Sequence, residues 1–153
     1  MELQKIKSFQ VDHTRLERGM YISRVDGDII TYDLRMKKPN SESVLENAAL
    51  HTIEHIFATY VRSGDDSEKI IYFGPMGCRT GFYFITRGLT HARAISLTKE
   101  AFEFISGFTG QIPGTDLKEC GNYLEHDLAG AKNEAIKYLW VLDRVCENSL
   151  DYN

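Results

Sequence analysis

The fold is decided between residues 20 and 36, which read MYISRVDGDIITYDLRM. Two runs rich in β-branched, aliphatic and aromatic residues, 20–25 and 29–36, flank the dipeptide Asp26-Gly27. That dipeptide tolerates the positive φ of a tight hairpin turn. The stretch therefore predicts two antiparallel strands joined by a short turn.

The second strand of this hairpin separates apolar from polar side chains. Successive residues of a strand point to opposite faces of a sheet. One face carries Ile30, Tyr32, Leu34 and Met36. The other face carries Thr31, Asp33 and Arg35. Asp33 and Arg35 form either a surface ion pair that contributes little or a clamp for a substrate, and position alone leaves both open.

A long helix is expected after Pro39-Asn40 ends the second strand. Ser43 and Glu46 have the spacing of a capping box, which predicts that the helix begins there and runs to about Arg62. Apolar residues recur along it at three- and four-residue spacing. Gly64 follows where a C-terminal cap belongs.

The rest of the chain predicts two more strands and two more helices. The strands are expected at 69–73 and 81–86, separated by an irregular loop at 74–78 that contains two glycines and a proline. Thr90 and Asp127 are typical helix N-caps. The helices that follow them are expected to end near 109–110 and 148, with irregular structure at 111–126 between them.

This order of elements predicts an α+β fold, a two-layer sandwich in which an antiparallel sheet of about four strands is covered by α-helices. A chain of 153 residues has the size of one ordinary domain, so residues 1–153 are expected to form a single domain.

Composition argues against several classes of partner. The net charge is −4, from 22 acidic and 18 basic residues, and no Lys/Arg cluster is present to neutralise phosphates, so nucleic acid is not expected as a partner. No basic leader with an apolar run and no bilayer-length apolar segment occurs. A cytoplasmic protein without a membrane partner is expected. Three cysteines without a C-x-x-C pair argue against a disulfide framework.

A candidate metal site lies on the first helix. His51 and His55 are four residues apart, so both imidazoles project from one face of the helix, about one turn apart. With Glu54 they form an H-x-x-E-H pattern, which in one class of zinc peptidases supplies two metal ligands and a carboxylate base. The alternative is a pair of ordinary helix histidines, which is common at this spacing.

A third ligand is expected from the irregular segment near the last helix. Cys120 offers a soft thiolate, and its polar neighbours make a core position a poor explanation. His126 is a rival third ligand that the spacing does not exclude. Cys146 fits the apolar periodicity of the last helix and is expected to pack.

A second cysteine is a candidate for proton transfer. Cys78 lies in the Gly-rich loop between two strands, where a side chain can face a cavity, and the neighbouring Arg79 could favour its thiolate. A structural role is the alternative. Ser8 and His13, taken alone, are unremarkable surface residues.

Together these motifs resemble the S-ribosylhomocysteine lyase (LuxS) family, which makes the precursor of the quorum-sensing signal autoinducer-2. The resemblance covers nearly the whole chain and is carried by five segments in order: SFQVDH at 8–13, YDLR at 32–35 with KPN at 38–40, HTIEH at 51–55, PMGCRTG at 75–81, and CG at 120–121 with HDLAGAK at 126–132. Arg79 departs from the family pattern, which has a glutamine after the cysteine.

The resemblance implies an enzyme with a defined site. His51, His55 and Cys120 would bind one divalent metal ion per subunit, Fe²⁺ in the family, for which Zn²⁺ or Co²⁺ can substitute. Glu54 and Cys78 would be the acid/base pair. Ser8, His13 and Arg35 match positions around the substrate. The family also implies a homodimer with its active sites at the subunit interface.

The implied reaction cleaves S-ribosylhomocysteine to homocysteine and 4,5-dihydroxy-2,3-pentanedione. The carbonyl moves along the ribose chain by aldose–ketose shifts until the thiol leaves by β-elimination. Each shift removes a proton beside a carbonyl, and a metal ion stabilises the enediolate that results. The rival readings are a small H-x-x-E-H zinc peptidase, which accounts for one motif only, and a structural metal-binding module, which usually closes its site with four protein ligands.

Overall fold

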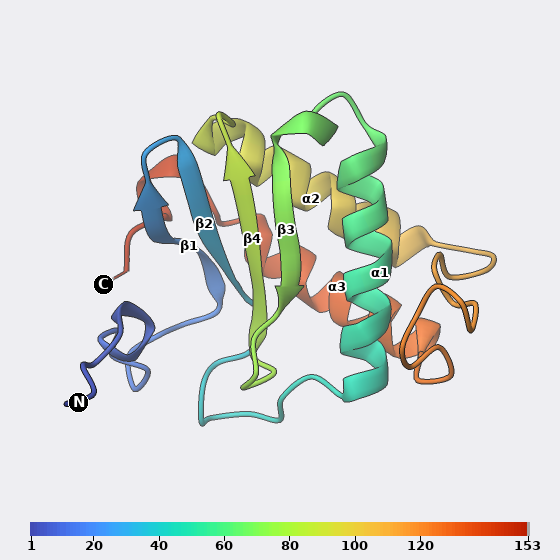
Figure 1. Cartoon of the computed structure of the whole chain (residues 1–153), viewed down its shortest axis with the longest axis horizontal. Coiled ribbons are helices and arrows are strands. Elements are labelled where there is room, and N and C mark those ends of the chain that lie inside the picture. The colour runs from blue at the N-terminus through green and yellow to red at the C-terminus, as the bar shows by residue number, and fades with distance from the viewer. Residues whose placement is uncertain (153) are drawn as a thin grey trace.

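The computed structural model describes residues 1–152, and in that range one four-stranded antiparallel sheet packs against three α-helices (Figure 1). The strands are β1 (Gly19–Asp26), β2 (Ile29–Arg35), β3 (Ile70–Pro75) and β4 (Gly81–Arg87). The helices are α1 (Asn47–Ser63), α2 (His91–Gly107) and α3 (Leu128–Leu142). Short 3-10 turns are η1 (Lys7–Phe9), η2 (Ser67–Lys69) and η3 (Glu147–Ser149). The predicted α+β class is confirmed.

The sheet has the order β1-β2-β4-β3, with every neighbouring pair antiparallel. The predicted hairpin joins β1 to β2, and Gly27 adopts a φ of 63° in its turn. β4 begins at Gly81, which pairs with Arg35. A Cβ at position 81 would strike the carbonyl oxygen of Leu34. Glycine therefore allows β4 to start this close to β2, and it brings Thr80 beside Arg35.

The core lies between the sheet and the helices. In Figure 1, α2 and α3 lie behind the sheet, and α1 runs beside β3. The inward side chains of β2 and β4 meet those of the helices, and these residues have no exposed surface: Tyr32, Leu34, Phe82, Phe84, Ile53, Phe57 and Phe102. Burial of apolar surface on this one face is what holds the two layers together.

The predicted start of the first helix is wrong. α1 begins at Asn47, and its N-cap residue Glu46 makes no side-chain capping bond. The preceding segment is extended instead, because Leu45 is fully buried and its N–H donates to the Arg79 carbonyl at 2.9 Å. A tertiary contact with the loop before β4 has overridden the local Ser43–Glu46 pattern.

The other predicted strands and helices are found in the structure, and only the residues at which some of them end differ from the prediction. Thr90 accepts from the Arg93 N–H and Asp127 from the Gly130 N–H, so both predicted N-caps are confirmed. β3 extends to Pro75, which an edge strand tolerates because the missing N–H faces outward. α2 ends at Gly107 and α3 at Leu142, both earlier than expected. Val145 and Leu150 are buried after α3, whereas the prediction that Cys146 packs in the last helix is wrong: it follows the end of α3 and is exposed. Of the helices described, none is long and apolar enough to cross a bilayer.

Candidate metal centre and active site

The middle of α1 presents its two histidines toward the long loop between α2 and α3. His51 and His55 are both half-buried, and their ring centroids lie 4.6 Å apart with the ring planes at 90°. This follows from the four-residue spacing, which puts the two side chains on one helix face. Perpendicular rings let the two in-plane nitrogen lone pairs point at one common place.

The loop at 108–127 brings two more donor groups to the same place. The Cys120 sulfur lies 3.4 Å from Nε2 of His51 and 3.9 Å from Nε2 of His55. The ligand atoms of these three residues and of His126 all lie within 4.8 Å of one another. We call these four residues the His/Cys cluster. All three cysteines of the chain are free thiols.

Backbone carbonyls set the orientation of both α1 histidines. Nδ1 of His51 lies 2.8 Å from the Glu125 carbonyl, and Nδ1 of His55 lies 2.8 Å from the Pro113 carbonyl. A carbonyl only accepts, so each Nδ1 donates and each Nε2 keeps a free lone pair. Gly114 makes the second bond possible: its φ is 71°, and a Cβ there would lie 3.0 Å from Nδ1 of His55.

The His/Cys cluster fits a transition-metal ion. Metal–ligand bonds of about 2.0–2.3 Å in a tetrahedral site place ligand atoms roughly 3.3–3.8 Å apart. Of the two Cys120 distances, 3.4 Å lies in this range and 3.9 Å lies just above it. Histidines whose other nitrogen donates to a carbonyl are typical metal ligands. Nε2 of His126 is buried with no hydrogen-bond partner among residues 1–152. Imidazole and thiolate together favour zinc, iron or cobalt over magnesium or calcium.

His126 differs from the other two histidines in its surroundings. Its ring stacks on that of His51, with centroids 4.1 Å apart and planes 22° from parallel. Burial, followed by the nearby His51 and His55, lowers the pKa of His126 to about 4. The ring is therefore neutral at pH 7.

Cys78 and His13 line a second feature, a cavity of about 640 Å³ bordered by residues 39–44. Cys78 is exposed, and its sulfur lies 3.0 Å from the Thr80 hydroxyl oxygen. His13 is held by a bond between its Nδ1 and the Val11 carbonyl at 2.8 Å. Two of the residues singled out in the sequence thus share one cavity.

Arg35 lies beneath this cavity, on the outer face of β2. Its side chain is 4% exposed and its guanidinium contacts two protein partners. Nε and Nη2 donate to the two carboxylate oxygens of Asp33 at 3.1 and 2.6 Å, and Nη1 donates to Thr80 Oγ1 at 2.7 Å. Arg35 therefore reaches Cys78 through Thr80. The alternative of a surface ion pair does not apply.

The remaining predicted residues make fewer contacts. Glu54, between the two histidines on α1, is half-buried and has no hydrogen bond or ion pair with the described residues. Ser8 lies in η1 and is not among the residues that line the Cys78 cavity. The Arg79 guanidinium is within 3.3 Å of the Leu45 carbonyl and 3.4 Å of Asn47 Oδ1, so it fastens the loop to the start of α1.

Two threonines in the site were missed by reasoning from the sequence. Thr80 connects Arg35 to Cys78, and Thr52 bonds the ring of His126. Thr52 lies inside the H-x-x-E-H pattern, but a residue between two candidate ligands carries no signal of its own. The contact with His126 spans 74 residues of sequence.

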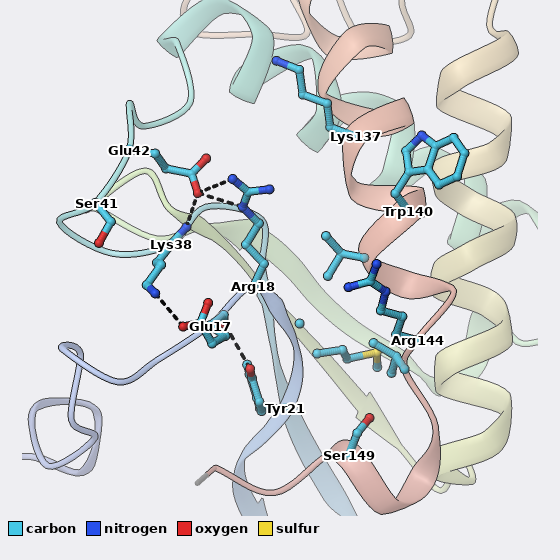
Figure 2. Close-up of a pocket in the computed structure, with 14 residues that line it drawn as sticks. Glu17, Arg18, Tyr21, Lys38, Ser41, Glu42, Lys137, Trp140, Arg144 and Ser149 are labelled. Atoms are coloured by element: carbon cyan, nitrogen blue, oxygen red, sulfur yellow. Dashed lines mark hydrogen bonds and ion pairs between the residues drawn. The ribbon is translucent and has the colours of Figure 1, made fainter.

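A cavity of about 660 Å³ lies between the start of β1 and α3 (Figure 2). On one side Arg18 pairs with Glu42, and Lys38 pairs with Glu17. On the other side is Trp140, which is 72% exposed. This cavity contains none of the residues of the His/Cys cluster, and it adjoins the Cys78 cavity only through residues 41–42.

This chain is similar to known proteins over nearly its whole length. A family model described as S-Ribosylhomocysteinase (LuxS) matches residues 6–149. Proteins named S-ribosylhomocysteine lyase from Desulfotalea psychrophila, Borreliella afzelii and Porphyromonas gingivalis are each 50% identical to this chain. Each of these alignments covers 98% of this chain and 99% of the relative.

Proposed function

The chain belongs to the S-ribosylhomocysteinase (LuxS) family, and we propose that it cleaves S-ribosylhomocysteine to homocysteine and 4,5-dihydroxy-2,3-pentanedione. The observation that carries the proposal is the His/Cys cluster: a pair of oriented histidines and a thiol converge on one place, in a chain that matches the family from residue 6 to residue 149. The product is the autoinducer-2 precursor, so a role in quorum sensing follows from the same proposal.

We propose His51, His55 and Cys120 as the metal ligands. The support is that their donor atoms have the mutual distances of a ligand set, and that carbonyls hold both histidines with Nε2 inward. A divalent ion bound there would supply a Lewis acid that stabilises negative charge on the oxygens of the substrate during each carbonyl shift. Iron is the metal expected from the family, and the donor set also suits zinc and cobalt.

Cys78 is proposed as the base for the first proton transfer. Its sulfur is exposed at the cavity, where a substrate carbon can approach it. Thr80 Oγ1 accepts from Arg35, which leaves the Thr80 hydroxyl hydrogen free to be donated to the sulfur. Arg35 thereby fixes the Thr80 hydroxyl, and the Thr80 hydroxyl in turn positions the Cys78 sulfur.

Glu54 is proposed for the later transfers and for the elimination of the thiol. The support is its position on α1 between the two proposed ligands, and its side chain has no hydrogen bond or ion pair with the described residues. Protons must be taken from one carbon and returned to its neighbour, which requires groups that exchange protons readily. The overall reaction consumes no water.

We propose a homodimer whose subunits complete the two sites, with Ser8 and His13 near the substrate. The family resemblance is one support for the dimer. The other is apolar surface left open on the N-terminal segment and on the edge strand β3, where these side chains are 49–85% exposed: Leu3, Ile6, Phe9 and Tyr72. Exposed apolar surface of this kind marks interaction sites. The cytoplasmic location expected from the sequence stays a prediction.

The zinc-peptidase alternative is not favoured. It would use Glu54 to activate water, and it leaves the convergence of Cys120 on the two histidines without a purpose. A thiol assay on S-ribosylhomocysteine beside a peptide-cleavage assay separates the two activities. A structural metal module is separated from an enzyme by whether the absorption spectrum of the cobalt-loaded protein responds to substrate.

Two substitutions test the assignment of the acid/base pair. Cys78→Ala and Glu54→Gln should each abolish homocysteine release while the protein keeps its metal content and its fold, since neither residue is a proposed ligand. The measurements are thiol release, metal content and circular dichroism. Cys146→Ala removes the other exposed cysteine and serves as the control with normal activity. Near-normal thiol release by Cys78→Ala or Glu54→Gln refutes the role of that residue.

A further inference from the structure

His126 contributes a buried nitrogen for which the structure supplies no partner. Its Nε2 is shielded from solvent and makes no hydrogen bond with residues 1–152. Burying a polar atom without a partner costs about 1–3 kcal/mol by protein mutational data. Such an atom inside a ligand-binding cluster points to a partner that arrives from outside the chain.

The hydrogen bonds of Thr52 determine what kind of partner Nε2 needs. Thr52 Oγ1 donates its one hydrogen to the Ala48 carbonyl at 2.9 Å and accepts from the Asp127 N–H at 2.9 Å. Its third contact is Nδ1 of His126 at 3.0 Å. Because the hydroxyl hydrogen is already used, Nδ1 must carry the proton and donate. With the hydrogen of the imidazole on Nδ1, the lone pair of Nε2 is left free to accept a hydrogen bond.

The ring geometry keeps His126 and His51 from sharing one ion, although the His126 plane stands at 71° to that of His55 with centroids 4.8 Å apart. The planes of His51 and His55 are perpendicular, so their in-plane lone pairs can meet at one ion. The planes of His51 and His126 are stacked at 22° with centroids 4.1 Å apart. Two nearly parallel planes at that separation keep both lone pairs from reaching one ion at about 2.0–2.1 Å in good geometry. Of the two stacked rings, His51 is the one whose Nε2 contacts the Cys120 sulfur, and the hydrogen bonds of the described residues include none between that sulfur and His126, so His126 is the ring left outside the ligand set.

We propose that Nε2 of His126 accepts a hydrogen bond from a hydroxyl group of the ribosyl chain, and that His126 is a substrate-binding residue. This inference rests on the proposed function, because a bare acceptor needs an O–H donor and the substrate of that reaction is a polyhydroxylated chain. A thiolate at Cys120 has no hydrogen to donate, and the carbonyls near the site only accept. Thr52 acts through His126 as a positioning residue.

The test measures substrate binding and metal binding in the same protein. Both are measured in a Cys78→Ala background, in which turnover is blocked, so that calorimetry with S-ribosylhomocysteine reports the Kd of the zinc-loaded protein. His126→Phe keeps a flat ring that can stack on His51 but removes the acceptor. We expect the Kd for substrate to rise about tenfold, the loss typical of one buried hydrogen bond. The affinity for zinc should stay within fivefold of the background value.

The controls distinguish the possible causes of a loss. Cys120→Ala removes a proposed ligand and should lose zinc affinity by more than a hundredfold, beyond the 10–100-fold cost of an outer contact. His91→Phe changes a histidine that bonds Tyr32 outside the site, and it should leave both affinities unchanged. Zinc binding by His126→Phe also shows that the cluster has folded.

Two results would overturn the inference. One is a rise of less than fivefold in the Kd for substrate. The other is a fall of more than fivefold in zinc affinity, which would make His126 a fourth metal ligand. Thiol release by the wild-type protein is measured alongside: an active wild type with normal binding by His126→Phe overturns this inference alone, whereas an inactive wild type overturns it together with the proposed function.

Discussion

The two polar regions of this molecule differ in whether their hydrogen-bonding groups are satisfied within the chain. In the His/Cys cluster, the inward nitrogens of His51 and His55 face only a thiol, and that of His126 faces no partner among the described residues. In the second region, the Asp33 network of Asp33, Arg35, Thr80 and Tyr152, each polar group meets another. Asp33 and Arg35 are 0% and 4% exposed.

Because of this difference, substitutions in the two regions should affect different properties: ligand binding in one region and the free energy of unfolding in the other. Atoms that lack a partner in the folded chain gain one only from a ligand, so removing the inward Cys120 thiol should reduce metal binding and leave the metal-free fold nearly unchanged. Atoms in a closed, buried network depend on one another, so breaking one contact leaves a charge or a polar group buried alone. Substitutions in the Asp33 network should therefore lower the free energy of unfolding.

Arg35→Met is expected to have the largest effect. It leaves the Asp33 carboxylate buried without its cation, which typically costs 3–5 kcal/mol in the free energy of unfolding. Turnover should also fall severely because Thr80 loses the donor that orients it. Urea denaturation measures the first effect. The control is Arg24→Met, whose ion pair with Asp26 is about half-exposed and should cost less than about 1 kcal/mol. Equal free energies of unfolding for Arg35→Met and Arg24→Met would contradict the view that the buried Asp33 network stabilises the fold.

Metal removal is expected to have the next largest effect. If the free ion is held about a hundredfold above its Kd, binding stabilises the folded state by about 2.7 kcal/mol, and a chelator should remove that increment. Unfolding is followed in urea with and without the chelator. Cys120→Ala should show almost no difference between the two conditions, whereas Cys146→Ala should keep it. A metal-dependent increment that survives in Cys120→Ala would contradict the assigned ligands.

Tyr152→Phe tests the far end of the Asp33 network. The tyrosine hydroxyl donates to Asp33 Oδ2 at 2.6 Å, and its ring stacks on Tyr21 with centroids 5.0 Å apart. The substitution keeps the ring and removes one bond to a carboxylate, so a loss of about 1–2 kcal/mol in unfolding free energy is expected. Tyr123→Phe, whose hydroxyl has no hydrogen-bond partner in the described chain, should change stability by less than about 0.5 kcal/mol.

Alkaline pH should weaken the Asp33 network gradually. Burial first, and then the Asp33 charge, raise the pKa values of Tyr21, Tyr83 and Tyr152 above 10. Below pH 10 these tyrosines are protonated in both states. Above pH 10 the unfolded chain releases their protons first, so the free energy of unfolding falls as pH rises. Urea midpoints between pH 9 and pH 11 measure this. The decline should be shallower in Tyr152→Phe, and an equal slope in both proteins would exclude Tyr152 as a contributor.

Local patterns in the sequence predicted most of the fold, because those patterns reflect interactions between residues that are close together in the sequence. The strand at 29–35, the turn at Gly27 and the N-caps Thr90 and Asp127 depend on contacts within a few residues, and all of them are found in the structure. The polar face of that strand is nevertheless buried, because Asp33 and Arg35 pair there. The capping box at Ser43 failed for the opposite reason: Leu45 is held by Arg79, which is 34 residues away.

The sequence by itself determined the pair of histidines on one face of α1, since four-residue spacing on a helix leaves no other arrangement. Only the tertiary structure decided that Cys120 approaches them across 65 to 69 residues, that Arg35 is buried against Asp33 and Thr80, and that His126 stacks on His51. Spacing along a helix is set by backbone geometry, which every residue shares. The path of the loop at 108–127 is set by which carbonyls and side chains it meets, and those partners are distant in sequence.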